Sequence, residues 1–256
     1  MNFYNANIII TGSSGDLGSK IISFLDKENS NLILLDKNPP IKSSKSHDYY
    51  RCDLSKVADI EQVCKKIDLK YKNIDIIINL AGVIEFNNFV NELNEKTELL
   101  FKINFLSAAY LTKYFLKGMM SKNSGIIVNI GSVFGSIAFP GFVSYSASKY
   151  ALRGFSEALR RELCDTNIKV LYIAPRAIKT KFNSGKINIF NDATKSKSDS
   201  IHYVSKIIID SIKNKHKEKY IGYPEKIFVK INSIFPRIVD IFLKNLPKII
   251  NKILNN

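Results

Sequence analysis

Cysteine and histidine are scarce in this sequence, and the few that are present exclude two kinds of site. The three cysteines, Cys52, Cys64 and Cys164, show no Cys-x-x-Cys spacing. We therefore expect neither a disulfide framework nor a zinc site, and a reducing cytosol is the natural setting. The three histidines are scattered without the spacing of metal ligands, so we assign no metal.

Long apolar runs are also missing. No stretch approaches the roughly 20 residues that a membrane-spanning helix needs, and residues 1–7 lack the basic and apolar segments of a signal peptide. These two absences predict a cytoplasmic protein. The 256 residues and the 45% hydrophobic content fit one large α/β domain with a full core and argue against global disorder.

Acidic residues are outnumbered, with 23 Asp and Glu against 38 Lys and Arg, which gives a formal charge of +15. Such an excess is typical of proteins that bind nucleic acid or an anionic membrane, although a coding bias towards Lys, Asn and Ile would also produce it. No arginine-rich helix or aromatic-interleaved basic stripe is present. We therefore expect no nucleic-acid partner, whereas contact with a membrane surface stays open.

A glycine-rich turn over residues 11–18 joins a predicted strand at 8–10 to an apolar helical face. Gly12 allows the tight turn, Gly15 lets the backbone approach a pyrophosphate at the helix N-terminus, and Gly18 lets helix and strand pack closely. The turn therefore predicts a dinucleotide site, to which it also contributes Ser14, Asp16 and Leu17.

An acidic residue ends the second predicted strand, 32–36, eighteen residues after Gly18. A carboxylate at Asp36 would hydrogen-bond both hydroxyls of the adenosine ribose and repel a 2′-phosphate, which favours NAD over NADP. Lys37 follows at once and could accept a phosphate, so NADP stays open as the alternative cofactor. The other interpretation of Asp36 is a turn former at the strand end.

Tyr145 and Lys149 are four residues apart in a predicted helix over 144–163, so they lie on one face, one turn apart. An ammonium group near a phenol favours the phenolate and lowers the tyrosine pKa from about 10 towards neutrality. Such a phenol can exchange a proton with an alcohol or a carbonyl oxygen. Ser132 follows a predicted strand at 126–130 and could hold the same oxygen. Because tyrosine–lysine pairs are common on helix surfaces, the pair alone is weak evidence.

Apolar strands alternate with helices along the chain, which predicts an α/β fold. The arrangement expected is a Rossmann-type, doubly wound parallel sheet in three α/β/α layers. The predicted strands are 8–10, 32–36, 75–79, 126–130, 169–174 and 219–223. The predicted helices are a stretch through 57–67 with Ser55 as its N-cap, 97–120, 144–163 and 201–213.

Ligands of such sheets bind beyond the carboxyl ends of the strands. Five of the selected residues fall at such ends: Gly12, Asp36, Asn79, Ser132 and Pro175. We therefore expect them to share one site. Asn104 lies inside the predicted helix 97–120, where an asparagine is unfavourable unless it has a further role.

With these motifs in place, residues 8–180 resemble the short-chain dehydrogenase/reductase family, in its single-domain form. The residues that match the family's catalytic tetrad are Asn104, Ser132, Tyr145 and Lys149. The resemblance implies that Tyr145 is the acid or base and that Ser132 holds the substrate oxygen. It also implies that Lys149 lowers the tyrosine pKa and binds the nicotinamide ribose. Asn104 would bend its helix and seat a water that relays protons.

The same resemblance assigns further cofactor contacts. Asp53 and Leu54 resemble the pair that contacts adenine, and the turn Asn79-Leu80-Ala81-Gly82 resembles the family's Asn-Asn-Ala-Gly turn. Pro175 to Thr180 resembles the Pro-Gly-x-x-x-Thr loop. Its backbone at Ile178 and the hydroxyl of Thr180 would hold the nicotinamide carboxamide.

Three positions depart from the family's pattern. The second glycine of the turn is at Gly15, as in the longer extended members, and Asp16 stands at its usual place. Leu80 replaces an asparagine, which removes a polar contact. Arg176 replaces a glycine beside the nicotinamide pocket, where it either binds an anionic group of the substrate or points to solvent.

Two segments near the end of the chain have open roles. Residues 183–200 are polar and predict either a mobile substrate lid or a plain surface insertion. We divide the chain into a catalytic domain, 1–223, and a basic amphipathic helical extension, 224–256, which Pro236 and Pro247 divide. The extension would pack on its own domain, on a second subunit or on an anionic membrane. It is similar to the tails of family members that act on lipidic substrates.

The sequence therefore predicts an oxidoreductase that interconverts a ketone or aldehyde and an alcohol by hydride transfer, with NAD or NADP as cofactor. The expected partners are a small carbonyl or alcohol substrate, lipid-like in one interpretation, and further copies of the chain in a dimer or tetramer, as the resemblance implies. The alternative is a catalytically silent dinucleotide sensor or scaffold on the same fold.

Overall fold

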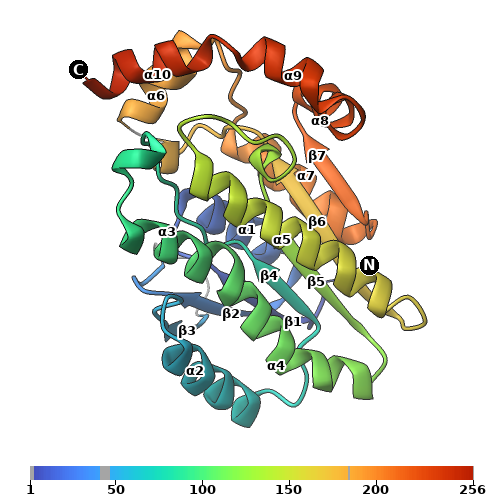
Figure 1. The fold of residues 1–256 in the computed structure, drawn as a ribbon. Coiled ribbons are helices and arrows are strands. Elements are labelled where there is room, and N and C mark those ends of the chain that lie inside the picture. Colours follow the sequence, from blue (N-terminus) through green and yellow to red (C-terminus); the bar gives the residue numbers. More distant parts are fainter. Residues whose placement is uncertain (1–2, 41–46, 184, 256) are drawn as a thin grey trace.

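The computed structural model describes residues 3–40, 47–183 and 185–255, and they form a seven-stranded parallel sheet between two layers of helices (Figure 1). The strand order is β3-β2-β1-β4-β5-β6-β7. Their bounds are β1 Asn7–Thr11, β2 Asn31–Asp36, β3 Asp48–Arg51, β4 Ile76–Asn79, β5 Gly125–Ile130, β6 Ile168–Pro175 and β7 Glu218–Ile221. The predicted doubly wound α/β architecture is confirmed.

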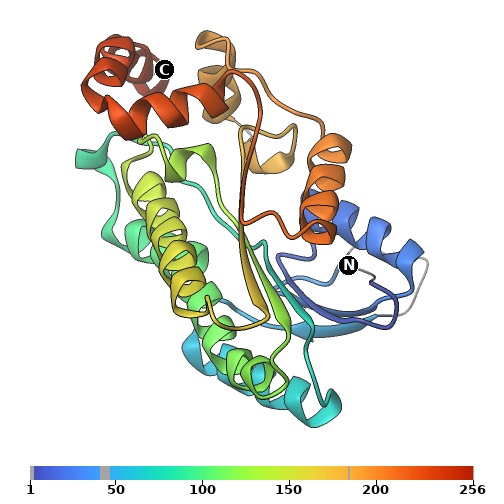
Figure 2. The ribbon, with the colours of Figure 1, turned by 90° about the vertical axis from the view of Figure 1, so that its right-hand side faces the viewer.

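Each face of the sheet is buried by its own helices, as the continuous apolar character of the central strands requires. Helices α1 (Asp16–Leu25) and α7 (Ile201–Lys213) pack on one face. Helices α2 (Val57–Lys70), α4 (Ser107–Ser121) and α5 (Val143–Glu162) contribute to the core on the other face (Figure 2). This three-layer core leaves the carboxyl ends of the strands as the edge at which a ligand can enter.

The third strand, β3, is absent from the sequence prediction, which has six strands instead of seven. It pairs with β2, with Leu34 opposite Tyr49. Its residues Asp48-Tyr49-Tyr50-Arg51 are half-buried or exposed, so they lack the apolar run by which the inner strands were identified. The stretch 38–46, whose Pro39-Pro40 pair predicts a loop, lies partly outside the described residues.

The predicted helix over 97–120 is interrupted. It consists of α3 (Asn94–Phe101), a π-helical turn over Lys102–Leu106 and then α4. Asn104 lies in the π-turn and directs its side chain to the backbone of Val83. A side chain that bonds to a neighbouring segment accounts for an irregular turn at this point.

The predicted N-cap at Ser55 is wrong. Helix α2 begins at Val57, and Lys56 in the cap position makes no side-chain cap bond. The Ser55 hydroxyl donates instead to the Asp53 carboxylate at 2.6 Å. The Ser55 hydroxyl therefore stabilises the loop between β3 and α2.

The last part of the chain is more helical than predicted. The segment 183–200 contains α6 (Lys186–Ala193), and the extension forms α8 (Glu225–Ile234), α9 (Pro236–Leu243) and α10 (Leu246–Asn255). Pro236 begins α9, whereas Pro247 lies in the first turn of α10, which tolerates a proline. Helices α6 and α10 pack together, and α8 to α10 lie across one end of the molecule (Figure 1). No helix within the described ranges has both the length and the apolar character needed to cross a bilayer.

Candidate active site

One large cleft, with a volume of about 1380 Å³, opens at the carboxyl ends of the strands. Its walls come from the ends of β2, β5 and β6, the turns after β1 and β4, and helices α1, α5, α6, α8 and α9. Seventeen of the nineteen residues selected from the sequence line this cleft. The two exceptions are Asn79 and Asn104. The structure therefore brings together motifs that lie up to 168 residues apart, from Gly12 to Thr180.

Ser132, Tyr145 and Lys149 meet at the inner end of the cleft. The Tyr145 side chain is buried and its hydroxyl hydrogen-bonds Ser132. The Ser132 Oγ accepts a further hydrogen bond from the Phe134 amide at 3.1 Å. The Lys149 Nζ lies 6.0 Å from the centre of the Tyr145 ring and donates to the Ile130 carbonyl oxygen at 3.2 Å. A substrate oxygen placed between Ser132 and Tyr145 would contact both hydroxyls.

The expected lowering of the tyrosine pKa is not observed. Burial raises the pKa of Tyr145 to about 12, and the hydrogen bond to Ser132 offsets this only in part. Burial also lowers the pKa of Lys149 to about 8. Both side chains are buried, so both charged forms lose hydration, and this loss is the main cause of each pKa shift. At neutral pH the phenol is therefore protonated and able to donate a proton.

Asn104 lies behind the cleft wall and does not line the cleft. Its Oδ1 accepts from the Val83 amide at 2.8 Å, and its Nδ2 donates to the Val83 carbonyl at 3.0 Å and to Ser148 Oγ at 2.9 Å. A Cβ added to Gly82 would lie 3.3 Å from Asn104 Oδ1 and 3.5 Å from Lys149 Nζ. Asn104 thus holds the Gly82–Val83 backbone against Lys149, and its role in a water relay stays a prediction.

Asn79 is likewise structural. Its Nδ2 donates to Asn129 Oδ1 at 2.8 Å, which joins the ends of β4 and β5. The following turn is held from β1, because the amides of Leu80 and Ala81 donate to Thr11 Oγ1 at 3.0 and 3.1 Å. Thr11 was not selected from the sequence, although it precedes the first glycine of the turn. It fixes the two backbone segments that form the floor of the cleft.

The glycine-rich turn has the geometry that a dinucleotide needs. Gly12 adopts a φ of +69°, and a Cβ there would lie 2.8 Å from the Ala81 Cα, so a side chain is excluded on both grounds. Gly15 is the N-cap of α1, whose first residues line the cleft and direct unpaired amides towards it. These features fit a pyrophosphate bound at a helix N-terminus.

Two carboxylates, those of Asp36 and Asp53, are held in place near the glycine-rich turn. The Asp36 oxygens accept from the amides of Ser14 and Asn38, both at 3.0 Å. Lys37 forms an ion pair with Asp53 at 3.6 Å, and hydrogen bonds from the Ser55 side chain hold the pKa of Asp53 below its ordinary value. Asp36 therefore presents a positioned negative charge to the cleft, next to a lysine that already has a partner.

An apolar lobe of the cleft, formed by aromatic and aliphatic side chains, was missed in the sequence. Phe142 lies between Tyr145 and α6, with its ring 6.5 Å from Tyr145 and 5.4 Å from Phe190. Phe134 stacks on Phe139 at 4.6 Å. Further apolar side chains that line the cleft include Ile84, Leu99, Ile187, Phe228, Val239, Phe242 and Leu243. The three phenylalanines between Ser132 and Tyr145 were the available signal.

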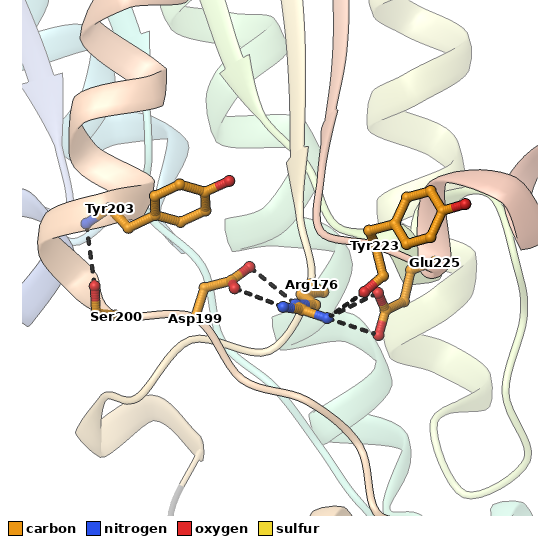
Figure 3. A network of polar contacts seen from close by, with 6 residues as sticks. All are labelled: Arg176, Asp199, Ser200, Tyr203, Tyr223 and Glu225. Carbon is orange, nitrogen blue, oxygen red and sulfur yellow. Dashed lines mark hydrogen bonds and ion pairs between the residues drawn. The ribbon is translucent and has the colours of Figure 1, made fainter.

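Arg176 does not point to solvent. Its guanidinium donates to Asp199, Glu225 and the Tyr223 carbonyl (Figure 3). Only 12% of the side chain is exposed. The interpretation that Arg176 points to solvent is wrong. Two carboxylates distant in sequence accept hydrogen bonds from its guanidinium, and its binding of an anionic group of the substrate stays a prediction.

Comparison with known proteins gives consistent matches. The family model described as short chain dehydrogenase matches residues 6–188. A 3-oxoacyl-[acyl-carrier-protein] reductase of Escherichia coli K12 is 30% identical over 187 residues, which cover 70% of this chain and 76% of that protein. An uncharacterized oxidoreductase of Saccharomyces cerevisiae is 33% identical over 187 residues. That match covers 69% of this chain but only 61% of the yeast protein, less than two thirds of its length.

Solved structures share the fold over nearly the whole chain. A short chain dehydrogenase from Burkholderia cenocepacia in complex with NADP has a TM-score of 0.82 at 17% identity, covering 95% of this chain and 99% of that one. A short chain dehydrogenase/reductase from Burkholderia phymatum in complex with NAD has a TM-score of 0.80 at 17% identity, covering 95% and 96%. At this level of identity the likeness establishes the architecture.

Proposed function

This chain belongs to the short-chain dehydrogenase family, and from that membership we propose that it is an NAD(P)-dependent oxidoreductase interconverting a carbonyl compound and an alcohol. The observation that carries the proposal is the single cleft that joins two sets of residues. A dinucleotide-type glycine turn and Asp36 lie at one end, and Ser132, Tyr145 and Lys149 lie at the other. A protein that only sensed the cofactor would not need the second set.

The residues at the inner end suit proton transfer to a reducible oxygen. A nicotinamide bound in the cleft supplies the hydride. The Tyr145 phenol, protonated at neutral pH because burial raises its pKa to about 12, donates the proton that the substrate oxygen takes up. The Ser132 hydroxyl holds that oxygen beside the phenol. The Lys149 ammonium stabilises the phenolate that remains.

The cofactor that best fits the outer end is NAD. The Asp36 carboxylate would accept from the ribose hydroxyls and repel a 2′-phosphate. Lys37, which could have compensated that repulsion, is paired with Asp53. The Thr180 hydroxyl and the backbone near Ile178, which also line the cleft, are proposed to hold the carboxamide end.

The test is a nicotinamide absorbance assay with a panel of ketones and aldehydes, run with NADH and with NADPH. We expect turnover with at least one carbonyl class and a lower KM for NADH. Tight NADH binding without turnover of any compound would favour the silent sensor instead. A lower KM for NADPH would contradict the assignment of Asp36.

We further propose that the substrate carries an extended apolar group. The apolar lobe begins at Tyr145 and continues through Phe142 and Phe190 to helices α8 and α9. Tyr145, Phe142 and Phe190 belong to one cluster of buried aromatic and aliphatic side chains, so a chain of methylene groups would exchange water for apolar contacts there. Burial of each methylene is worth about 0.8 kcal/mol.

A chain-length series tests the apolar lobe. For a homologous set of linear ketones or aldehydes, kcat/KM should rise by about two- to fourfold with each added methylene until the lobe is filled. Phe228→Glu at its edge should lower kcat/KM for the longest substrates and leave the shortest unchanged. Phe89→Glu, at an exposed phenylalanine outside the cleft, is the control. A kcat/KM independent of chain length would exclude an apolar substrate.

Contact with an anionic membrane surface is a second proposal, and it concerns the outer side of α8 and α9. Ile234, Phe235, Ile238 and Ile241 are between 43% and 72% exposed, which is unusual for apolar side chains so close together in sequence. The cations Lys226, Lys230, Arg237 and Lys244 flank them and are exposed as well. Apolar insertion combined with surrounding positive charge fits the interface of an anionic bilayer.

Vesicle sedimentation tests the membrane contact. The protein should sediment with vesicles containing phosphatidylserine, and less with pure phosphatidylcholine or at high salt. Ile234→Asp combined with Ile241→Asp should abolish sedimentation and preserve turnover of a short, water-soluble substrate. Leu69→Asp, at an exposed leucine on α2, is the control. Equal recovery in the supernatant with both vesicle types would refute the membrane contact. If the wild type self-associated and the double variant did not, the surface would instead be an interface with a second copy of the chain.

A further inference from the structure

Arg176 is built into the wall of the cleft at the point where β6 ends. Its side chain is 12% exposed and forms a double hydrogen bond with Asp199: Nε donates to Oδ2 at 2.9 Å and Nη2 to Oδ1 at 2.7 Å. Asp199 directly precedes Ser200, which caps α7 by accepting from the Tyr203 amide at 3.2 Å (Figure 3). One side of the guanidinium is therefore attached to the start of a core helix.

The other side of the guanidinium is attached to the C-terminal extension. Nη1 donates to the Glu225 carboxylate at 3.0 and 3.3 Å and to the Tyr223 carbonyl at 3.1 Å. Glu225 is the first residue of α8. The chain makes room for this arrangement at Gly222, which has a φ of +114° and where a Cβ would lie 2.6 Å from Arg176 Cδ. Gly222 and Arg176 therefore fit each other.

Asp199 also holds the loop that follows Arg176. Its amide donates to the Ala177 carbonyl at 2.9 Å, and its carbonyl accepts from the Lys179 amide at 3.0 Å. The far end of the loop is held by Asp16, whose Oδ2 accepts from the Lys181 amide at 2.8 Å. The loop of residues 177–181 is thus fixed at both ends, and Ile178 and Thr180 in it line the cleft.

We propose that Arg176 is a positioning residue for the reaction, which fixes the loop 177–181 and the first turn of α8 relative to each other. The loop lines the part of the cleft where the nicotinamide carboxamide is proposed to bind, and α8 carries Phe228 of the apolar lobe. The inference rests on the proposed function, because it joins the wall that would touch the cofactor to the wall that would touch the substrate. A substrate wall held in this way would keep a fixed position relative to the bound cofactor.

The geometry explains why an arginine is needed. Two carboxylates and one carbonyl approach the guanidinium from two sides, and its planar fork of donors serves all three at once. A lysine has a single ammonium and cannot bridge both sides. Arg176→Lys therefore keeps the charge but loses the connection between loop and helix.

Single substitutions test the two sides of the Arg176 guanidinium separately. Glu225→Gln, which releases α8, should raise KM for the carbonyl substrate about tenfold and change the NADH dissociation constant less than about twofold. Asp199→Asn, which releases the loop, should raise the NADH dissociation constant about tenfold. Arg176→Lys should show both effects. Glu157→Gln is the matched control. Glu157 forms an ion pair with Arg161 on the same helix, α5, and neither residue lines the cleft.

A measurement independent of turnover distinguishes this inference from the enzyme assignment. NADH is added to each protein, and its binding is verified by fluorescence. Bound NADH should slow hydrogen exchange of the α8 amides in the wild type and in the Glu157→Gln variant, but not in Glu225→Gln or Arg176→Lys. This holds whether or not any carbonyl compound is turned over. Equal NADH-dependent protection of α8 in all four proteins would overturn the proposal, as would a loss of thermal stability without any change in KM or NADH affinity.

Discussion

Tyr145→Phe is expected to lower kcat/KM for carbonyl reduction by about 10²–10⁴-fold, the usual contribution of a general acid. The substitution removes only the hydroxyl. The ring contacts with Phe134 and Phe142, at centre distances of 6.1 and 6.5 Å, remain. The fold and the NADH dissociation constant should therefore be unchanged, and steady-state kinetics alongside NADH fluorescence checks both.

The control for this variant is Tyr203→Phe, which removes the same hydroxyl from a tyrosine on α7 that is 49% exposed and lies outside the cleft. It should have wild-type kinetics. If Tyr145→Phe retained a large part of the activity, the proton would have to come from another group, and the assignment of the inner end of the cleft would be wrong.

Lys149→Met is expected to stabilise the cofactor-free protein while abolishing turnover. Burial lowers the pKa of Lys149 from 10.5 to about 8, and a shift of this size corresponds to a cost of about 3 kcal/mol for the charged form. Among the described residues, the only hydrogen-bond partner recorded for Nζ is the Ile130 carbonyl, a bond worth about 1 kcal/mol. Methionine keeps most of the volume without the charge, so the free energy of unfolding at pH 7 should rise by about 1–3 kcal/mol.

The stability difference should depend on pH. The folded-state pKa lies below the unfolded one, so between pH 8 and 10.5 the unfolded state binds the additional proton. The stability of the wild type therefore rises with pH in this window, relative to the variant. The full penalty is present below pH 8, and the gap between the proteins should narrow towards pH 10. Urea titrations at several pH values, with exposed Lys113→Met as control, check this. A constant gap would contradict it.

The architecture and the position of the site were predictable because they depend on local signals. The apolar runs of β1, β2, β4, β5 and β6 are buried on both faces, and such strands are recognisable without their neighbours. The residues after them must converge, because parallel strands end at one edge. Strand β3 was not predicted because it is a half-exposed edge strand whose sequence contains no apolar run.

Several properties of the site were not predictable, because they arise between distant segments. Arg176 bonds to residues 23 and 49 positions further along the chain, and no local pattern connects them. The division at 224 and the homo-oligomer both stay predictions. The apolar lobe required α6 and the C-terminal helices to fold back over Tyr145, which placed Phe190 from a segment expected to be a polar loop.

The amino-acid sequence by itself determined which residues are chemically suited to proton transfer and to dinucleotide binding, and at which edge of the sheet they gather. Those properties follow from residue type, spacing and strand direction. Only the tertiary structure decided the protonation of Tyr145, the partners of Arg176 and the apolar character of one lobe of the cleft. Desolvation and long-range hydrogen bonds depend on what packs around a group, and that surrounding exists only once distant segments of the chain have come together.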